Sequence, residues 1–196
     1  MKTIVCLLVL LLFTTSVRAA SPTNEADTVQ ALAERFVNAV AREDLAAARA
    51  CWFSSDKLKE LAANPPAGID PRELTEKSLE YTKEQWMKRD AAIAVRFRTL
   101  VDGLKKRDLP LSKIQLAELT PKLPGTKNGM AFADNLEVIM KIDDVKIEYR
   151  LGDAKQLNGR WYCLEYPGEG ATVIRNDRAD SIQPEKPTRA GDSEKP

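Results

Sequence analysis

Residues 136–151 read LEVIMKIDDVKIEYRL, and this stretch decides the fold class. Apolar and mostly charged residues alternate along it in two runs, which Asp143 and Asp144 separate. The apolar positions are Leu136, Val138, Met140 and Ile142 in the first run, and Val145, Ile147, Tyr149 and Leu151 in the second. A period of two is typical of a strand with one buried face. The stretch therefore predicts two antiparallel strands whose apolar face packs against another layer.

Two further stretches extend the predicted sheet. LSKIQLAEL at 111–119 and RWYCLEY at 160–166 also read as strands, and the first predicted strand of the hairpin begins at Met130. Asn128-Gly129 and Asn158-Gly159 are dipeptides that favour the positive φ of tight hairpin turns. Together these features predict a four-stranded antiparallel sheet.

The residues before the sheet have helical periodicity. We expect a helix over 24–44 with Asn24 as its N-cap, a short one over 44–52 and another over 54–64. A long helix should follow, because Asp70-Pro71 is a strong start signal and Pro110 is its latest end. A run of helices followed by a run of strands predicts an α+β fold, with the long helix and its neighbours packed on a curved sheet.

Leu79, Trp86, Ile93 and Leu100 are spaced seven residues apart along the predicted long helix. This spacing leaves two interpretations open. The residues form either the buried face of one amphipathic helix or a seam for self-association as a homo-oligomer.

The first 19 residues have the layout of a cleaved secretory signal. Lys2 precedes an unbroken apolar run from Ile4 to Phe13, and Val17-Arg18-Ala19 supplies the small or apolar residues that a signal peptidase reads. The rival interpretation, an uncleaved membrane anchor, needs roughly 20 mostly apolar residues, and the polar residues from Thr14 onward end the run sooner. We therefore predict cleavage after Ala19, a secreted or periplasmic location and no membrane span afterwards.

Composition predicts where the domain ends. Residues 168–196 contain no aromatic residue and are rich in Pro, Glu, Lys, Ser and Gly, which is typical of a disordered tail. The expected organisation is a signal peptide over 1–19, one α+β domain over 20–167 and a disordered tail over 168–196.

Several kinds of chemistry are disfavoured by composition. Without Lys2 and Arg18 the chain has 28 basic and 29 acidic residues, which gives no support for a nucleic-acid partner. The chain has no histidine, which removes Ser–His and Cys–His nucleophile pairs and His-containing metal sites. It also lacks a phosphate-binding glycine loop and a dinucleotide fingerprint. We expect neither a metal nor a cofactor.

Cys51 and Cys163 are the two cysteines outside the predicted signal. In an exported protein such a pair can form a disulfide, which here would join a helix to the last strand. The alternative is two small buried apolar side chains. The sequence leaves both open.

Two motifs carry a resemblance to a known superfamily. REDLAAARACWF at 42–53 and NGRWYCL at 158–164 resemble the nuclear transport factor two-like (cystatin-like) α+β superfamily, and the likeness covers 24–55 and 110–167. It implies a bent sheet wrapped around the long helix as a cone, which encloses a ligand pocket in some members. Members include isomerases, dehydratases, polyketide cyclases and exported proteins of unknown activity. The segment 56–107 is longer than this pattern expects.

The functional expectation is a non-catalytic binding domain for a small apolar ligand or a protein partner. Alternation places Trp161 and Cys163 on one face of the last strand and Tyr162, Leu164 and Tyr166 on the other, as core or as a ligand surface. The candidate ligand-binding residues are Trp86, Tyr149, Trp161 and Tyr162.

The alternative function is a cofactor-free isomerase or cyclase that uses an acidic residue and a tyrosine in an apolar pocket. Asp134 or Glu137 with Tyr149 would be its residues, although Glu137 falls on the charged face of its strand.

Overall fold

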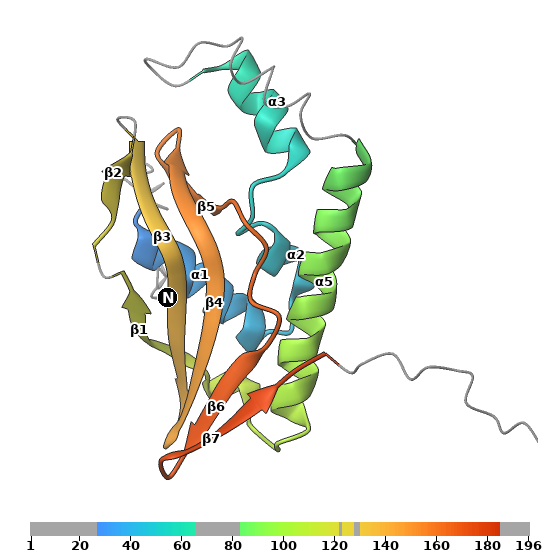
Figure 1. Cartoon of the computed structure of the whole chain (residues 1–196), viewed down its shortest axis with the longest axis vertical. Coiled ribbons are helices and arrows are strands. Elements are labelled where there is room, and N and C mark those ends of the chain that lie inside the picture. The colour runs from blue at the N-terminus through green and yellow to red at the C-terminus, as the bar shows by residue number, and fades with distance from the viewer. Residues whose placement is uncertain (1–26, 66–82, 122, 128–129, 185–196) are drawn as a thin grey trace, which may run out of the picture.

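The computed structural model describes residues 27–65, 83–121, 123–127 and 130–184 (Figure 1). The predicted signal peptide, Asn24, the Asp70-Pro71 helix start, Leu79, the Asn128-Gly129 turn and the end of the predicted tail after Gln183-Pro184 lie outside these residues. No helix in the described ranges is long and apolar enough to span a membrane.

Four α-helices of the described chain precede the sheet, as the sequence predicts. They are α1 (Val29–Ala41), α2 (Leu45–Arg49), α3 (Ser55–Ala63) and the long α5 (Lys83–Lys105). The N-cap of α1 is Thr28, whose hydroxyl accepts a hydrogen bond from the Ala31 N–H at 3.0 Å, so the prediction of Asn24 as the cap is wrong. Asp44 and Ser54 cap α2 and α3 in the same way.

The described strands form one antiparallel sheet of seven strands rather than four. A 3₁₀ turn, η1 (Leu111–Lys113), leads into β1 (Gln115–Thr120), β2 (Gly125–Lys127), β3 (Met130–Ile142), β4 (Val145–Leu157), β5 (Arg160–Cys163), β6 (Ala171–Arg175) and β7 (Arg178–Ile182). The strand order is β1-β3-β4-β6-β7, while β2 pairs with β3 and β5 pairs with β4. Both expected turns in the described residues form, with φ of 52° at Asp143 and 47° at Asn158.

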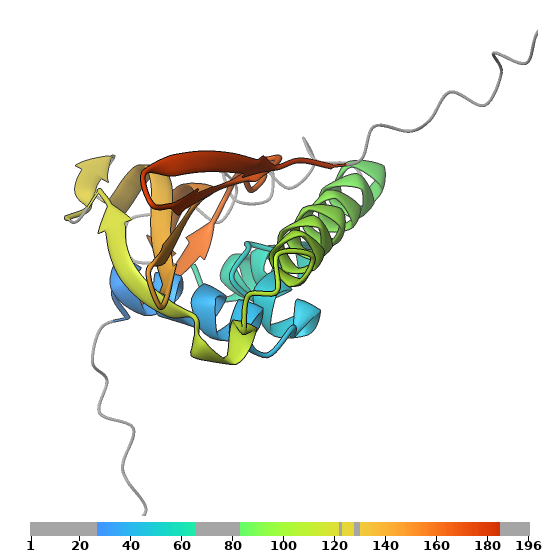
Figure 2. The same cartoon turned by 90° about the horizontal axis from the view of Figure 1, so that it is seen from below.

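The predicted end of the domain at residue 167 is wrong. Residues 171–182 form the β6–β7 hairpin, which pairs with β4 through Lys146–Tyr149 and contacts α5 through β7. In Figure 1 the hairpin lies at the lower end of the sheet and β7 points toward the lower part of α5, and Figure 2 gives the view from below. The turn between its strands is Asn176-Asp177, at which both residues have positive φ.

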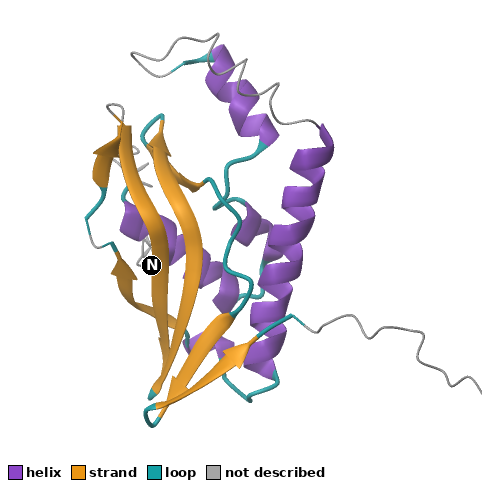
Figure 3. Ribbon diagram, in the orientation of Figure 1, coloured by secondary structure: helices purple, strands orange, loops and turns teal. Residues whose placement is uncertain are grey.

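One face of the sheet is buried and the other is polar, as the alternation in residues 136–151 predicts. The buried positions of β3 and β4 include Val138, Met140, Ile147 and Tyr149, and they share one core with residues of α1 and α5. Figure 3 shows the helices gathered on one side of the sheet. On the opposite face, Glu137 of β3 lies directly across from Arg150 of β4 in the strand register. Ile93 and Leu100 of α5 are also in this core, so the seven-residue spacing marks the buried face of one helix rather than an open seam.

Both outer strands of the sheet are modified in ways that hinder further strand pairing. In β7 the Ser181 N–H donates to the Asp180 carboxylate at 2.8 Å, and the Ser181 carbonyl accepts from Arg107 at 3.2 Å. In β1 the pairing register with β3 shifts between Leu116 and Glu118, which marks a bulge. Side-chain capping and bulges are both ways in which proteins protect sheet edges.

Candidate functional site

Residues 158–167, the aromatic stretch NGRWYCLEYP, separate the core from the surface on which we place the candidate site. Trp161, Tyr162 and Cys163 in β5 are all buried, whereas Glu165 and Tyr166 after the strand are exposed. The two faces of β5 pack into different clusters, Trp161 and Cys163 into the main core and Tyr162 into a second one, so both faces of the strand are covered.

Two of the four predicted ligand-binding residues are core residues. The rings of Tyr149 and Phe36 stack with centroids 5.4 Å apart and an interplanar angle of 3°, and both side chains are almost fully buried. Burial raises the pKa of the Tyr149 phenol, although the charge of Arg96 partly opposes the rise. Trp161 is buried in the same cluster. These aromatic residues fill the space that an internal ligand would occupy.

The other two predicted residues, Trp86 and Tyr162, lie on either side of Phe53. The Phe53 centroid is 6.4 Å from that of Trp86 and 6.0 Å from that of Tyr162. Tyr162 forms a small second core with Leu61 and Leu157 under α3. A hollow of about 160 Å³ lies beside this cluster, and its rim carries charged residues such as Lys57 and Arg160. It is smaller than the roughly 300–1,000 Å³ of typical ligand pockets.

The backbones of Cys51 and Cys163 lie side by side, but their side chains are free, buried thiols. The Cys163 N–H donates to the Cys51 carbonyl at 2.9 Å, and the Phe53 N–H donates to the Cys163 carbonyl at the same distance. Burial raises the pKa of Cys51 to about 11 and that of Cys163 well above its ordinary value. A buried neutral thiol is a poor nucleophile, so neither cysteine is suited to covalent chemistry in the folded state.

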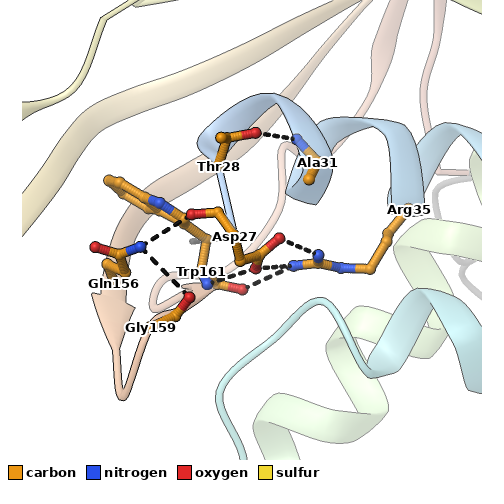
Figure 4. A network of polar contacts seen from close by, with 7 residues as sticks. All are labelled: Asp27, Thr28, Ala31, Arg35, Gln156, Gly159 and Trp161. Carbon is orange, nitrogen blue, oxygen red and sulfur yellow. Dashed lines mark hydrogen bonds and ion pairs between the residues drawn. The ribbon is translucent and has the colours of Figure 1, made fainter. Parts of the chain in front are cut away.

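A polar network joins the start of α1 to the β4–β5 hairpin (Figure 4). Arg35 donates to the Asp27 carboxylate at 2.6 and 2.9 Å and to the Trp161 carbonyl at 3.1 Å. The Trp161 N–H donates to the same carboxylate at 2.9 Å, and Gln156 donates to the Asp27 carbonyl at 2.9 Å. Every group of Asp27 is used to fasten two elements, so we assign this network a structural role.

The strongest candidate for a binding site is a hollow of about 530 Å³ between α5 and residues 164–169. Three arginines line it: Arg89 and Arg96 from α5 and Arg150 from β4. Tyr166 lines it too, with 41% of the residue exposed and with the Arg96 guanidinium 5.4 Å from its ring centroid. We call this hollow the arginine hollow.

The three arginines are held to different degrees. Arg89 is only 4% exposed, donates to the Cys163 carbonyl at 3.2 Å and stacks on Trp86 at 5.4 Å. Arg96 donates to the Pro167 carbonyl and to Glu169, while Arg150 pairs with Glu165 at 3.3 Å. Arg89 and Arg96 are therefore fixed by backbone carbonyls, and Arg150 is held only by an exposed carboxylate among its described contacts.

Sequence reasoning missed most of this site. It selected Trp86, whose ring contacts the Arg89 guanidinium, but not Arg96, Arg150 or Tyr166 as binding residues. A weak signal for Tyr166 was present, because alternation placed it on the outer face of the last stretch. The arginines gave none, since charged residues are scattered throughout the chain and only the fold brings these three together.

Comparison with known proteins adds no relative. No family model matches the chain, and neither the curated proteins nor the solved structures contain a significant match. The resemblance to the nuclear transport factor two-like superfamily therefore stays a prediction from the two sequence motifs.

Proposed function

We propose that this protein is a non-catalytic binding domain whose ligand carries an anionic group, a carboxylate or a phosphate, that occupies the arginine hollow. The observation that carries the proposal is the convergence of three guanidinium groups and one exposed tyrosine on a single hollow of about 530 Å³. That volume lies within the range of small-molecule sites. The sequence also predicted a binding function, but for an apolar ligand in the interior. The proposed ligand is anionic and binds at the surface.

The chemistry of arginine favours this kind of ligand. A guanidinium presents a planar fork of N–H donors that matches the two oxygens of a carboxylate or phosphate. Arg89 is already fixed by burial, so little side-chain entropy is lost when it binds. An aromatic or aliphatic part of the ligand would lie on Tyr166, which is 41% exposed.

The carboxylates that neutralise the hollow are weakly held. The Glu169 side chain is 78% exposed and that of Glu165 is 50% exposed. Exposed ion pairs contribute only about 0–1 kcal/mol, because water screens both charges. A ligand anion can therefore replace either glutamate at small cost, while the displaced side chain returns to solvent.

The geometry does not favour the alternative of an isomerase or cyclase. That mechanism needs a carboxylate beside a tyrosine in an apolar pocket. Tyr149 stacks on Phe36 within the core. Glu137 lies opposite Arg150 in the β3–β4 register, on the other face of the sheet. Asp134 is exposed at an irregular part of β3.

As part of the same proposal, we infer that residues 1–19 are a cleaved leader and that the binding function belongs to an exported protein. We expect the mature chain to begin at Ala20. N-terminal sequencing of the protein recovered from a secreting host tests that point, and a chain that retains Met1 or Lys2 would contradict it.

Calorimetric titration with benzoate, phenyl phosphate and inorganic phosphate tests the binding proposal. We expect at least one of these probes to bind the wild-type protein. Arg150→Gln should weaken that binding about tenfold, because one charge-assisted pair is lost. Lys146→Gln is the matched control, since Lys146 is an exposed cation of the same strand outside the hollow, and its affinity should equal that of the wild type.

Two outcomes contradict the proposal. One is the absence of measurable heat with all three probes. The other is equal weakening by Arg150→Gln and Lys146→Gln, which would mean that the anion is attracted by general charge and not by the hollow.

A further inference from the structure

A second group of basic residues surrounds the end of α5 near Lys105 and the β6–β7 hairpin, away from the arginine hollow. Two hollows of about 670 and 720 Å³ lie there, and Arg107 lines both of them. We call this surface the basic belt. The basic residues that line it are Arg98, Lys105, Lys106, Arg107, Arg175 and Arg178.

The charge of the basic belt differs from that of the chain. Six basic residues line the two hollows against two acidic ones, Asp102 and Asp180, which leaves an excess of four positive charges. The whole sequence has a formal net charge of only +1. Arg107 is already paired with Asp180 at 3.0 Å and Lys105 with Glu43 at 2.9 Å, so these two contribute less than their full charge to the attraction. Positive charge is therefore concentrated at one end of a nearly neutral chain, which favours an acidic partner.

Apolar residues also line both hollows. Leu109 and Val173 line the first hollow, and Val95 and Ile182 line the second. Val95, on α5, is 54% exposed and is therefore accessible to a partner at this surface. A partner that offers aliphatic side chains between its acidic ones would contact both the apolar and the basic residues.

We propose that the basic belt binds an extended acidic segment of a partner protein, in which acidic and aliphatic residues alternate. A peptide fits better than a nucleic acid because none of the residues that line either hollow is aromatic, whereas single-stranded nucleic acids bind by stacking on aromatic rings. The segment binds through its side chains and does not add a strand to β7, because side chains occupy both backbone groups of Ser181.

Fluorescence anisotropy with a short labelled peptide that alternates Glu with Val tests this inference. We expect saturable binding that weakens as salt is added, because the attraction is between exposed charges. A peptide with Gln in place of Glu should bind much more weakly. The double variant Arg175→Glu/Arg178→Glu should weaken binding of the acidic peptide about five- to tenfold, since each reversal removes one attraction and adds one repulsion.

The control variant is Lys59→Glu on α3, at the opposite end of the molecule from the hairpin (Figure 1). It reverses one exposed charge, half the change made by the double variant, at a site outside the basic belt, so it should leave peptide affinity unchanged. Circular dichroism of each variant verifies folding. Because the variants lie outside the arginine hollow, their binding of benzoate and phenyl phosphate should match that of the wild type.

Four results would overturn the inference: no binding of the acidic peptide, equal binding of the Gln peptide, unchanged affinity in the double variant, or equal loss in Lys59→Glu. Tighter binding of a labelled oligothymidine or of vesicles rich in anionic lipid than of the acidic peptide would also overturn it. In that case the belt would serve a nucleic acid or a membrane surface instead.

Discussion

Ile182 of β7 packs directly onto Gly103 of α5, with no room for even a methyl group between them. A Cβ at Gly103 would lie 2.9 Å from the Ile182 Cδ1 atom and nearer still to Cγ2. Both residues are buried. This contact fastens the C-terminal hairpin to the long helix and explains the presence of glycine inside a helix.

Gly103→Ala should destabilise the protein by about 1–3 kcal/mol, because overpacking a filled contact has that effect. The same change at an open helix position would stabilise by about 0.5–1 kcal/mol, so the predicted sign is opposite to the usual one. Urea unfolding measures the difference. In the Ile182→Ala background the space is open and the substitution should be neutral or stabilising; an equal loss in both backgrounds would rule out this explanation.

Asp27→Asn should lower the free energy of unfolding at pH 7 by about 1–3 kcal/mol, since Asp27 makes charge-assisted hydrogen bonds. Burial alone would raise the pKa of Asp27. The bond from Arg35, the Trp161 N–H and the charges of Arg35 and Arg160 outweigh burial and hold the pKa below its ordinary value of 3.8.

The sign of the pH dependence follows from that lowered pKa. The contribution of Asp27 is fully present above pH 3.8 and is lost as the pH falls from there through the pKa of the folded state. The difference in unfolding free energy between the wild type and Asp27→Asn should therefore shrink on acidification in that range. A difference that stays constant between pH 7 and pH 2.5 would contradict the role of the ionised carboxylate.

Cys51 and Cys163 should react very slowly with iodoacetamide at pH 8 in the folded protein, because burial excludes the reagent and raises both pKa values. In denaturant without reductant, peptide mapping should find both residues alkylated, as expected for the free thiols of the structure. If alkylation requires prior reduction, the two cysteines form the disulfide that the sequence also allowed.

Arg107→Ala should loosen β7 with little effect on α1. Arg107 donates to the Asp180 carboxylate and to the Ser181 carbonyl of β7, and its third bond, to the Gly103 carbonyl, fixes its side chain to the end of α5, so its loss removes both of these contacts to the hairpin. Amide hydrogen exchange of Ala179 and Ser181 should quicken, and stability should fall by about 0.5–1.5 kcal/mol. Arg178→Ala on the same hairpin is the control, and equal exchange in both variants would refute the assignment.

The parts of the fold that sequence predicted well are those in which one residue pattern is linked to one buried face. The alternation in residues 136–151 gave β3, β4 and the Asp143 turn, because a strand that buries every second side chain must repeat with that period. The helical stripe of α1 is a local feature of the same kind. The seam residues Ile93 and Leu100 were ambiguous, since seven-residue spacing suits an amphipathic helix and a coiled coil alike.

The β6–β7 hairpin was missed because its stability is not local. Only Ile182 of β7 is buried, and the strand is held by Gly103, by Arg107 and by its pairing with β6. A composition with few apolar residues and no aromatic one then resembles a disordered tail. The same reason applies to the candidate site: Arg89, Arg96 and Arg150 are far apart in the sequence and line one hollow only in the folded chain.

The C-terminal hairpin also determines how the protein can be shortened safely. A chain cut at residue 167, where composition suggests that the domain ends, would leave Lys146–Tyr149 of β4 without their partner strand. The backbone N–H and C=O groups that now bond to β6 would become an unpaired sheet edge. In the full chain the edge is β7, where Asp180 and Arg107 bond to the backbone of Ser181. Such a chain should precipitate or form strand-paired assemblies as its concentration rises. The last two strands thus preserve solubility, and the shortest well-behaved form of this protein is one that retains them.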